Sequence, residues 1–178
     1  IKKGMKGELK LMEKAEEVAN ELTDIPSFDL PSFDSLFEEE KYIVSNLKKV
    51  FLMLSGAGLK KYGMDLENHQ EVLLSISDIL IEIYMSESAI LRTEKNCKRY
   101  GAEKYSAQIA ASRLYLFEAC ELIISKSREL IFSLSDGSEQ KFLLMGLKRF
   151  TKYYNYPKPI DLKRTIANIV AEENKYTL

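Results

Sequence analysis

The stretch VLLSISDILIEIYMSESAILRTEKNCKRYG, residues 72–101, decides the fold class of this chain. Ile76, Ile83 and Ile90 recur every seven residues, a spacing that places them on one face of an α-helix. Gly101 follows, and glycine is the common residue just past the last turn of a helix. The pattern predicts a long helix whose core face also includes Val72, Ile79 and Leu80.

The same seven-residue step continues beyond Gly101. Ile109, Leu116, Ile123 and Leu130 predict a second long helix that returns beside the first. The 8 glycines and 4 prolines of the chain are few, and they cluster between such segments, where they end helices. The expected helices cover about residues 7–23, 35–62, 66–100, 103–135, 138–152 and 161–172.

The start of the chain is expected to form an arm. Pro26 and Pro31 force extended backbone before them and indicate a linker. Ser35 and Glu38 then match the S-x-x-E pattern of a capping box, which predicts a helix start. We therefore divide the chain into residues 1–34, a helix and a Pro-containing linker, and residues 35–178, a helical bundle domain.

Long helices with wide apolar stripes and short connections bury themselves best against one another in antiparallel order. The expected fold is all-α: an antiparallel helical bundle of about four main helices with an N-terminal helical arm. With 178 residues and 46% hydrophobic residues, such a bundle needs no disulfide or metal to fold.

Composition limits the partners and the cellular compartment that can be expected for this chain. A net charge of −1 creates no global field that attracts nucleic acid, and we expect no nucleic-acid partner. The longest apolar run is interrupted by Asp78 and Glu82, so it is too charged to span a bilayer. Only 2 cysteines occur, which favours a reducing compartment and predicts a cytoplasmic protein.

Candidate reactive side chains are few. His69 is the only histidine, and a structural role is expected because a metal site needs several ligands. Cys97 and Cys120 lie on either side of Gly101, and in a helical hairpin they are about 22 Å apart, too far for a disulfide. With no Cys–His or Ser–His–Asp arrangement indicated, we assign no catalytic, cofactor-binding or metal-binding residue to this chain.

Two further motifs have a simpler explanation. The sequence SGAGLKKYG, residues 55–63, fails the templates of phosphate-binding loops, and its small residues indicate a close helix contact instead. Glu82, Glu87 and Glu94 recur along one expected helix, where acid–base work is one possibility and the solvated side of a helix is the commoner one.

Charge is unevenly distributed. Residues 8–40 hold eleven acidic residues and two lysines, whereas residues 141–164 hold seven basic residues and one aspartate, with aromatic residues between them. The basic segment has the composition of a nucleic-acid or anionic-membrane surface. We favour contact with the acidic segment or with a neighbouring domain.

The residues in order resemble a known family. KGMKGEL at 3–9, LMLSGAGLKKYG at 52–63 and ILIEIYMSESAILRTEK at 79–95 are similar to the C-terminal region of acyl-CoA dehydrogenases. The likeness is to the long form with an extra helical domain, as in the very-long-chain enzymes. KGMKGEL resembles the point where the chain leaves the dehydrogenase core.

The resemblance implies a parent enzyme that binds FAD and oxidises the α,β carbon–carbon bond of an acyl-CoA thioester, with an electron-transfer partner and peripheral membrane contact possible. The catalytic residues of the family precede the matched phrases, so the expectation is that this chain alone binds no FAD and is inactive. Its implied role is packing on its own dehydrogenase core within a homodimer. The alternatives are a stand-alone helical protein-interaction module and a metal-dependent bundle enzyme.

Overall fold

The computed structural model describes residues 10–24 and 31–173, and over these ranges it contains helices and no strand. The expected all-α fold is therefore confirmed. The phrase KGMKGEL and Pro26 lie outside the described residues. The helices are α2 (Leu11–Thr23), α3 (Glu38–Tyr62), the 3₁₀ helix η1 (Gly63–Asn68), α4 (Gln70–Tyr100), the 3₁₀ helix η2 (Glu103–Tyr105), α5 (Ser106–Leu134), α6 (Gly137–Phe150) and α7 (Pro159–Glu173).

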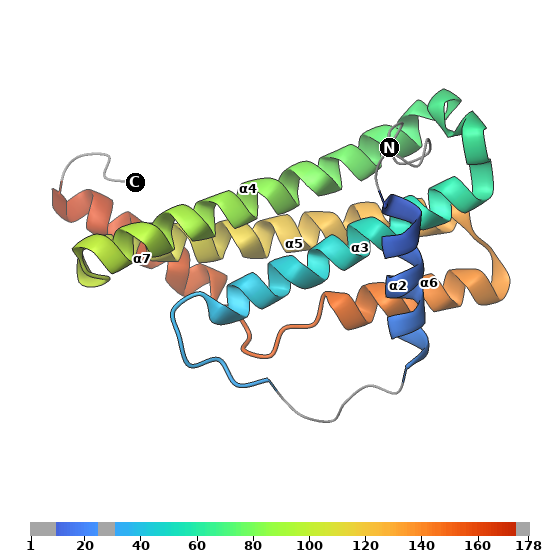
Figure 1. Ribbon diagram of the computed structural model, residues 1–178. Coiled ribbons are helices and arrows are strands. Elements are labelled where there is room, and N and C mark those ends of the chain that lie inside the picture. Colours follow the sequence, from blue (N-terminus) through green and yellow to red (C-terminus); the bar gives the residue numbers. More distant parts are fainter. Residues whose placement is uncertain (1–9, 25–30, 174–178) are drawn as a thin grey trace.

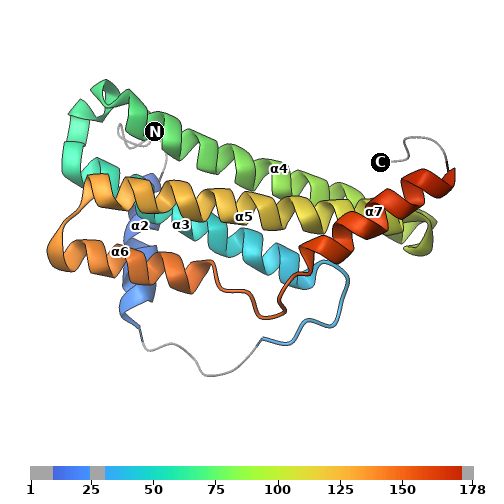
Figure 2. The same cartoon turned by 180° about the vertical axis from the view of Figure 1, so that it is seen from behind.

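Helices α3 to α6 run in alternating directions and form the expected antiparallel bundle (Figure 1). α3 and α5 lie in the middle, with α4 along one edge and α6 along the other, in both views (Figures 1 and 2). α7 extends past one end of the bundle, where it packs on α5. No helix among the described residues is long and apolar enough to cross a bilayer.

Glycines end two of the long helices, as expected. Gly63 follows α3 with φ 53° and Gly101 follows α4 with φ 92°. Residues other than glycine rarely adopt such positive φ angles. The starts of the helices differ from the expected ones. A 3₁₀ turn precedes both α4 and α5, so the two helices begin at Gln70 and Ser106 rather than near 66 and 103.

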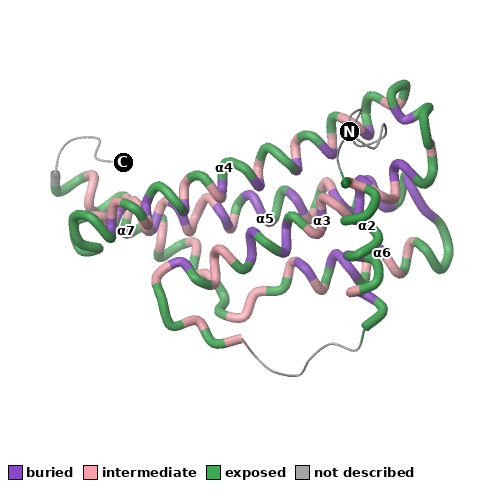
Figure 3. The backbone as a smooth tube through the Cα atoms, viewed as in Figure 1, coloured by how far each residue is buried: buried purple, intermediate pink, exposed green. Residues whose placement is uncertain are grey.

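The predicted heptad stripes form the core. Ile76, Ile83 and Ile90 are at most 1% exposed, and they pack in one cluster with Leu116, Ile123 and Leu130 of α5. Leu80 was expected beside them and is 46% exposed, because its position on α4 turns it away from α3 and α5. Figure 3 shows this division, with buried positions on the inner side of α4 and exposed positions on its outer side.

The N-terminal helix lies across the bundle rather than projecting from it. α2 packs on α3, and Ala15, Val18 and Leu22 are buried there. A side-chain atom added at Gly56 would lie 2.9 Å from the Ala15 Cβ atom, closer than real contacts allow. The small residues of SGAG therefore serve a close helix contact, as expected. The division of the chain at residue 34 stays a prediction.

Candidate functional site at the start of helix α3

The first turn of α3 carries four charged residues in a row, Glu38 to Lys41. Successive residues of a helix point about 100° apart, so neighbouring side chains reach in different directions. Each of the four binds a different part of the chain. This turn is therefore the junction at which the entry segment, two other helices and the segment before α7 are held together.

Glu38 closes the helix start, although not in the predicted way. Its Oε2 accepts the backbone N–H groups of Asp34 at 2.8 Å and Ser35 at 3.0 Å. The Ser35 hydroxyl also donates to this carboxylate, so only half of a capping box forms, and α3 begins three residues later than expected. Phe37, at φ 65°, makes the sharp entry into the helix. The bonds to Ser35 and Asp34 hold the pKa of Glu38 below its usual value.

Glu39 holds the segment that leads to α7. Its Oε1 accepts the backbone N–H groups of Asn155 at 2.7 Å and Tyr154 at 3.2 Å, and its Oε2 accepts the Asn155 amide at 2.8 Å. The rings of Phe33, Tyr42 and Tyr154 pack against one another, with centroids 5.7 to 6.0 Å apart. One carboxylate therefore fixes a segment 116 residues away in sequence.

The next two residues reach the long helices. Glu40 accepts a hydrogen bond from Nε of Arg113 on α5 at 2.6 Å, and the Arg113 guanidinium also lies over the Phe37 ring. Lys41 donates to Glu94 of α4 at 3.0 Å. Glu94 is also paired with Lys98, and the bonds from Lys98 and Lys41 lower its pKa below the usual value.

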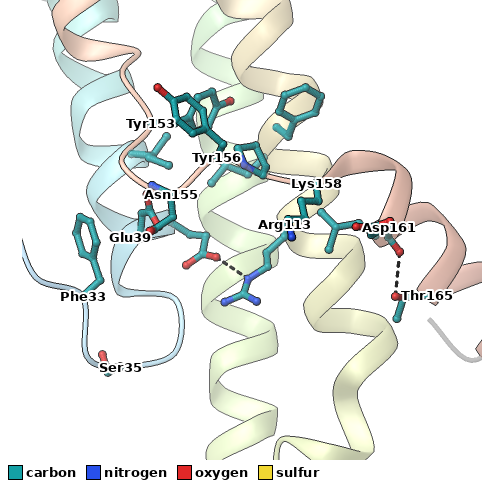
Figure 4. A pocket seen from close by; sticks show the side chains of 16 residues that line it. Phe33, Ser35, Glu39, Arg113, Tyr153, Asn155, Tyr156, Lys158, Asp161 and Thr165 are labelled. Atoms are coloured by element: carbon teal, nitrogen blue, oxygen red, sulfur yellow. Dashed lines mark hydrogen bonds and ion pairs between the residues drawn. The ribbon is translucent and has the colours of Figure 1, made fainter.

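A cleft of about 490 Å³ opens beside this junction, between the start of α3, the middle of α5 and the start of α7. Figure 4 shows its side chains, with the Glu40–Arg113 bond on one wall and Asp161 and Thr165 of α7 on another. Leu116 and Phe117 of α5 give it an apolar side. Tyr153 lines both this cleft and a larger one of about 1000 Å³, whose basic residues are Lys148, Arg149 and Lys152.

Two buried groups near the cleft are held in their protonated forms. Burial raises the pKa of the Cys120 thiol to about 11. Burial also raises the pKa of Tyr153, with the Cys120 sulfur beside its hydroxyl as a further cause. Both groups are neutral at physiological pH and suit packing better than nucleophilic attack, because the thiolate is the reactive form of cysteine.

His69 and Cys97, two of the residues singled out from sequence, do not line this cleft. His69 stacks on Tyr62, with ring centroids 3.7 Å apart, and bonds Asp65 at 3.2 Å. Cys97 and Cys120 are free and buried, as expected. His69 is thus a packing residue at the turn between α3 and α4, far along α3 from the junction (Figure 1).

The three glutamates of α4 bind neighbouring helices. Glu82 accepts the Tyr115 hydroxyl at 2.8 Å, and burial together with this bond raises the pKa of Tyr115 to about 12. Glu87 accepts from Lys48 at 2.6 Å, and Glu94 is the partner of Lys41. Within the described ranges, no three His, Cys, Asp or Glu residues gather in a group able to hold a metal ion.

The basic segment does contact the acidic one. Arg149 donates to the backbone carbonyl of Glu21 at 3.0 Å, and Glu39 holds the backbone of Tyr154 and Asn155. This contact is one of the two that sequence reasoning favoured, the other being with a neighbouring domain. The same reasoning missed the roles of Glu39, Glu40 and Arg113, for which the only signal was the unbroken run of acidic residues at a helix start.

Comparison with known proteins identifies relatives. The family description "Acyl-CoA dehydrogenase, C-terminal domain" matches residues 46–149. A "Probable acyl-CoA dehydrogenase" of Bacillus subtilis (strain 168) is 35% identical over 179 residues, which cover 100% of this chain and 30% of the relative. A crystal structure of an acyl-CoA dehydrogenase complexed with FAD from Bacillus anthracis is 34% identical, with a TM-score of 0.88 over 99% of this chain and 29% of that chain. The chain thus spans less than a third of the length of either relative.

Proposed function

This chain belongs to the acyl-CoA dehydrogenase family, and from that premise we propose that it is the C-terminal α-helical domain of an FAD-dependent acyl-CoA dehydrogenase. The whole enzyme removes hydrogen across the α,β carbon–carbon bond of an acyl-CoA thioester, transfers it to FAD and passes electrons to a protein partner. Within it, this chain has a structural and assembly role: it packs on the dehydrogenase core and supports a homodimer in the cytoplasm.

One observation carries the proposal. A flavin-containing dehydrogenase is similar to this chain over nearly its whole length, with a TM-score of 0.88, while the chain spans 29% of that enzyme. The likeness therefore concerns one part of a larger protein. The long form of the family, typified by very-long-chain enzymes, is the form we propose for the parent, because KGMKGEL at residues 3–9 resembles the end of the dehydrogenase core.

The placement of charged side chains supports an assembly role: some bind other segments of this chain, and others remain exposed. Glu39, Glu40 and Lys41 are each engaged with another segment of this chain, so they serve to hold the domain in one shape. Lys148 and Lys152 are exposed beside the larger cleft and offer a basic surface to a neighbouring domain. A rigid domain with such a surface is suited to docking.

The decisive experiment is a segment exchange. In the Bacillus subtilis relative, the segment that this chain matches is replaced by the chain, and the product is compared with the same relative lacking the segment. The exchanged protein should bind FAD stoichiometrically and dehydrogenate an acyl-CoA, whereas the shortened protein should lose flavin or dimerisation. An exchanged protein no better than the shortened one, although its helical content is intact, would overturn the proposal.

The chain by itself gives a second measurement. Purified alone, it should show no flavin absorbance and no oxidation of acyl-CoA, because the proposed catalytic residues belong to another part of the parent. Stoichiometric flavin in the isolated chain would contradict the assigned role.

A further inference from the structure

Helix α4 has two seams with the same spacing on opposite faces. The inner seam packs in the bundle and follows alternating steps of four and three residues: Val72, Ile76, Ile79, Ile83, Ser86, Ile90, Thr93 and Cys97, all buried. A second series with the same steps runs along the opposite face, and all of its residues are exposed: Gln70, Leu74, Ser77, Ile81, Tyr84, Ser88, Leu91 and Lys95. We call this second series the outer seam.

Half of the residues of the outer seam are large and hydrophobic, although nothing in the chain's described part covers them. Leu74 is 64% exposed, Ile81 55%, Tyr84 67% and Leu91 48%. Leu80 and Met85 flank the middle of the seam and are similarly exposed. α4 forms the edge of the bundle in both views, with its outer side exposed along the length of the helix (Figures 1, 2 and 3). Steps of four and three residues are the pattern with which one helix packs along another.

The order of residue types along the outer seam is nearly the same from either end. About a midpoint between Glu82 and Ile83, Ile81 corresponds to Tyr84, Ser77 to Ser88 and Leu74 to Leu91. The flanking Leu80 and Met85 correspond in the same way. A surface with this symmetry is complementary to itself when two copies run in opposite directions, which is the condition for a two-fold interface.

We propose that the outer seam of α4 pairs in antiparallel orientation with the outer seam of a second copy of this chain. Ile81 then faces Tyr84 of the second copy, and Leu74 faces Leu91 of the second copy. Ser77 of each copy faces Ser88 of the other, and these two polar layers fix the register, since a polar layer is tolerated only opposite another small or polar layer. The interface concerns this chain alone and goes beyond docking on a dehydrogenase core.

Charge selects the same orientation. Exposed Arg92, Lys95 and Arg99 lie toward the end of α4, whereas exposed Glu71 lies in its first turn and exposed Asp65 just before it. Antiparallel copies place the basic end of one helix beside the acidic start of the other. Parallel copies would place like charges together, which is unfavourable.

The first test is the oligomeric state of the 178-residue chain by sedimentation equilibrium. The wild type should be a dimer, and Ile81→Asp should raise its dissociation constant at least about tenfold, as for a central interface residue. Ile160→Asp is the matched control, because Ile160 is 65% exposed on α7, away from the seam, and should leave dimerisation unchanged. Replacing both Ser77 and Ser88 by Leu should tighten the dimer at least about tenfold, since it fills the polar layers.

Cysteine cross-linking tests the orientation. Chains carrying Leu74→Cys and chains carrying Leu91→Cys are mixed and oxidised; the native cysteines are buried and provide the background. The mixture should form disulfides that join position 74 of one copy to position 91 of the other. Two copies that both carry Leu74→Cys should not react with each other, because antiparallel pairing holds the two positions about 25 Å apart along the helices.

Three results would overturn the inference: a monomer at high concentration, a dimer indifferent to Ile81→Asp, or cross-linking of position 74 to position 74. A monomer whose seam variants lose association with a dehydrogenase core would show that the core, and not a second copy, covers α4. Circular dichroism of each variant separates loss of pairing from loss of folding. These outcomes are independent of the segment exchange, which tests the role in the parent enzyme.

Discussion

Helices α2 and α7 flank the same bundle and have 13 and 15 residues, yet they are attached very differently. α2 buries Ala15, Val18 and Leu22, whereas no described residue of α7 is fully buried. α7 rests on α5 through half-buried apolar residues and one exposed ion pair, Lys163 with Glu118 at 2.9 Å. How deeply a helix docks therefore depends on the surface that receives it.

The receiving surfaces explain this difference. α2 lies where Gly56 of α3 and Gly146 of α6 provide room: a Cβ atom at Gly146 would meet Leu22 at 2.7 Å and Met53 at 2.6 Å. Two helices approach closely when the residues between them lack side chains. On α5 the larger residues Leu116 and Phe117 line the cleft that α5 shares with α7, and α7 stays further out.

The largest expected effect contrasts one buried leucine with one half-buried isoleucine. Leu22→Ala on α2 should lower the free energy of unfolding by about 2–4 kcal/mol, because it removes buried methyl groups and leaves a cavity. Ile166→Ala on α7 should cost less than about 1 kcal/mol, since that side chain is partly in water already. Urea unfolding measures both, and equal losses would show that α7 is docked as firmly as α2.

The second prediction concerns the close contact itself. Gly56→Ala should destabilise the chain by about 1–2 kcal/mol, because the new methyl group meets the Ala15 Cβ atom and neither can rotate away. Gly58→Ala is the matched control on the same helix. Its new methyl group would find Ile76, Leu66 and Val72 at 3.7 to 3.8 Å, so it should be neutral or stabilising by up to about 1 kcal/mol through helix propensity.

A reciprocal exchange sharpens that test. Ala15→Gly removes the methyl group on the other side of the contact, so adding it to Gly56→Ala should recover much of the stability lost through the clash. Thermal unfolding of the two single variants and the double variant gives the coupling between the positions. Additive losses would show that the two helices are not in the close contact described.

A smaller effect is expected where α7 is tethered. Glu39→Ala removes the acceptor of three hydrogen bonds from Tyr154 and Asn155 and should cost about 1–2 kcal/mol, reduced by the partial exposure of the site. Amide exchange should rise in residues 151–158 and α7 and stay unchanged in α2. Glu139→Ala, which breaks only an exposed pair with Lys60, is the control and should change stability by less than about 0.5 kcal/mol.

The smallest effect belongs to the surface pair of α7. Lys163 and Glu118 are 60% and 53% exposed, and such pairs are screened by water and salt. Lys163→Ala should therefore change the free energy of unfolding by less than about 0.5 kcal/mol. This change should be equally small at low and at high salt. A salt-dependent loss larger than this would mean that the pair, and not apolar packing, holds α7.

The helices of this chain were predictable because the information is local. A seven-residue apolar step, as at Ile76, Ile83 and Ile90, determines which face of a helix is buried, and a glycine such as Gly101 determines where the helix ends. The starts of α4 and α5 were misplaced, because a 3₁₀ turn and an α-helical turn use the same residue types and differ only in which carbonyl accepts the bond. Leu80 was wrongly assigned to the core. It lies at the border of the apolar stripe, where residue type alone does not tell whether a side chain faces the core or the solvent.

The candidate site was not predictable in the same way. Charge favoured contact of basic residues 141–164 with acidic residues 8–40 or with a neighbouring domain, but it did not predict the pairing of Glu39 with Asn155, 116 residues apart. Such a pair forms only when several helices bring two segments to the same level of the bundle. The same holds for Arg113 and Glu40, 73 residues apart.

The all-α antiparallel bundle, the faces that form its core and the family resemblance were predictable from the sequence. They rest on periodicity, glycine positions and residue order, which are properties of the linear chain. Only the tertiary structure decided that α2 lies across the bundle, that the first turn of α3 joins four segments and that a second seam on α4 remains uncovered within the described part of the chain. These features depend on which surfaces meet in space, and a surface can be recognised as partnered or free only after the helices have packed.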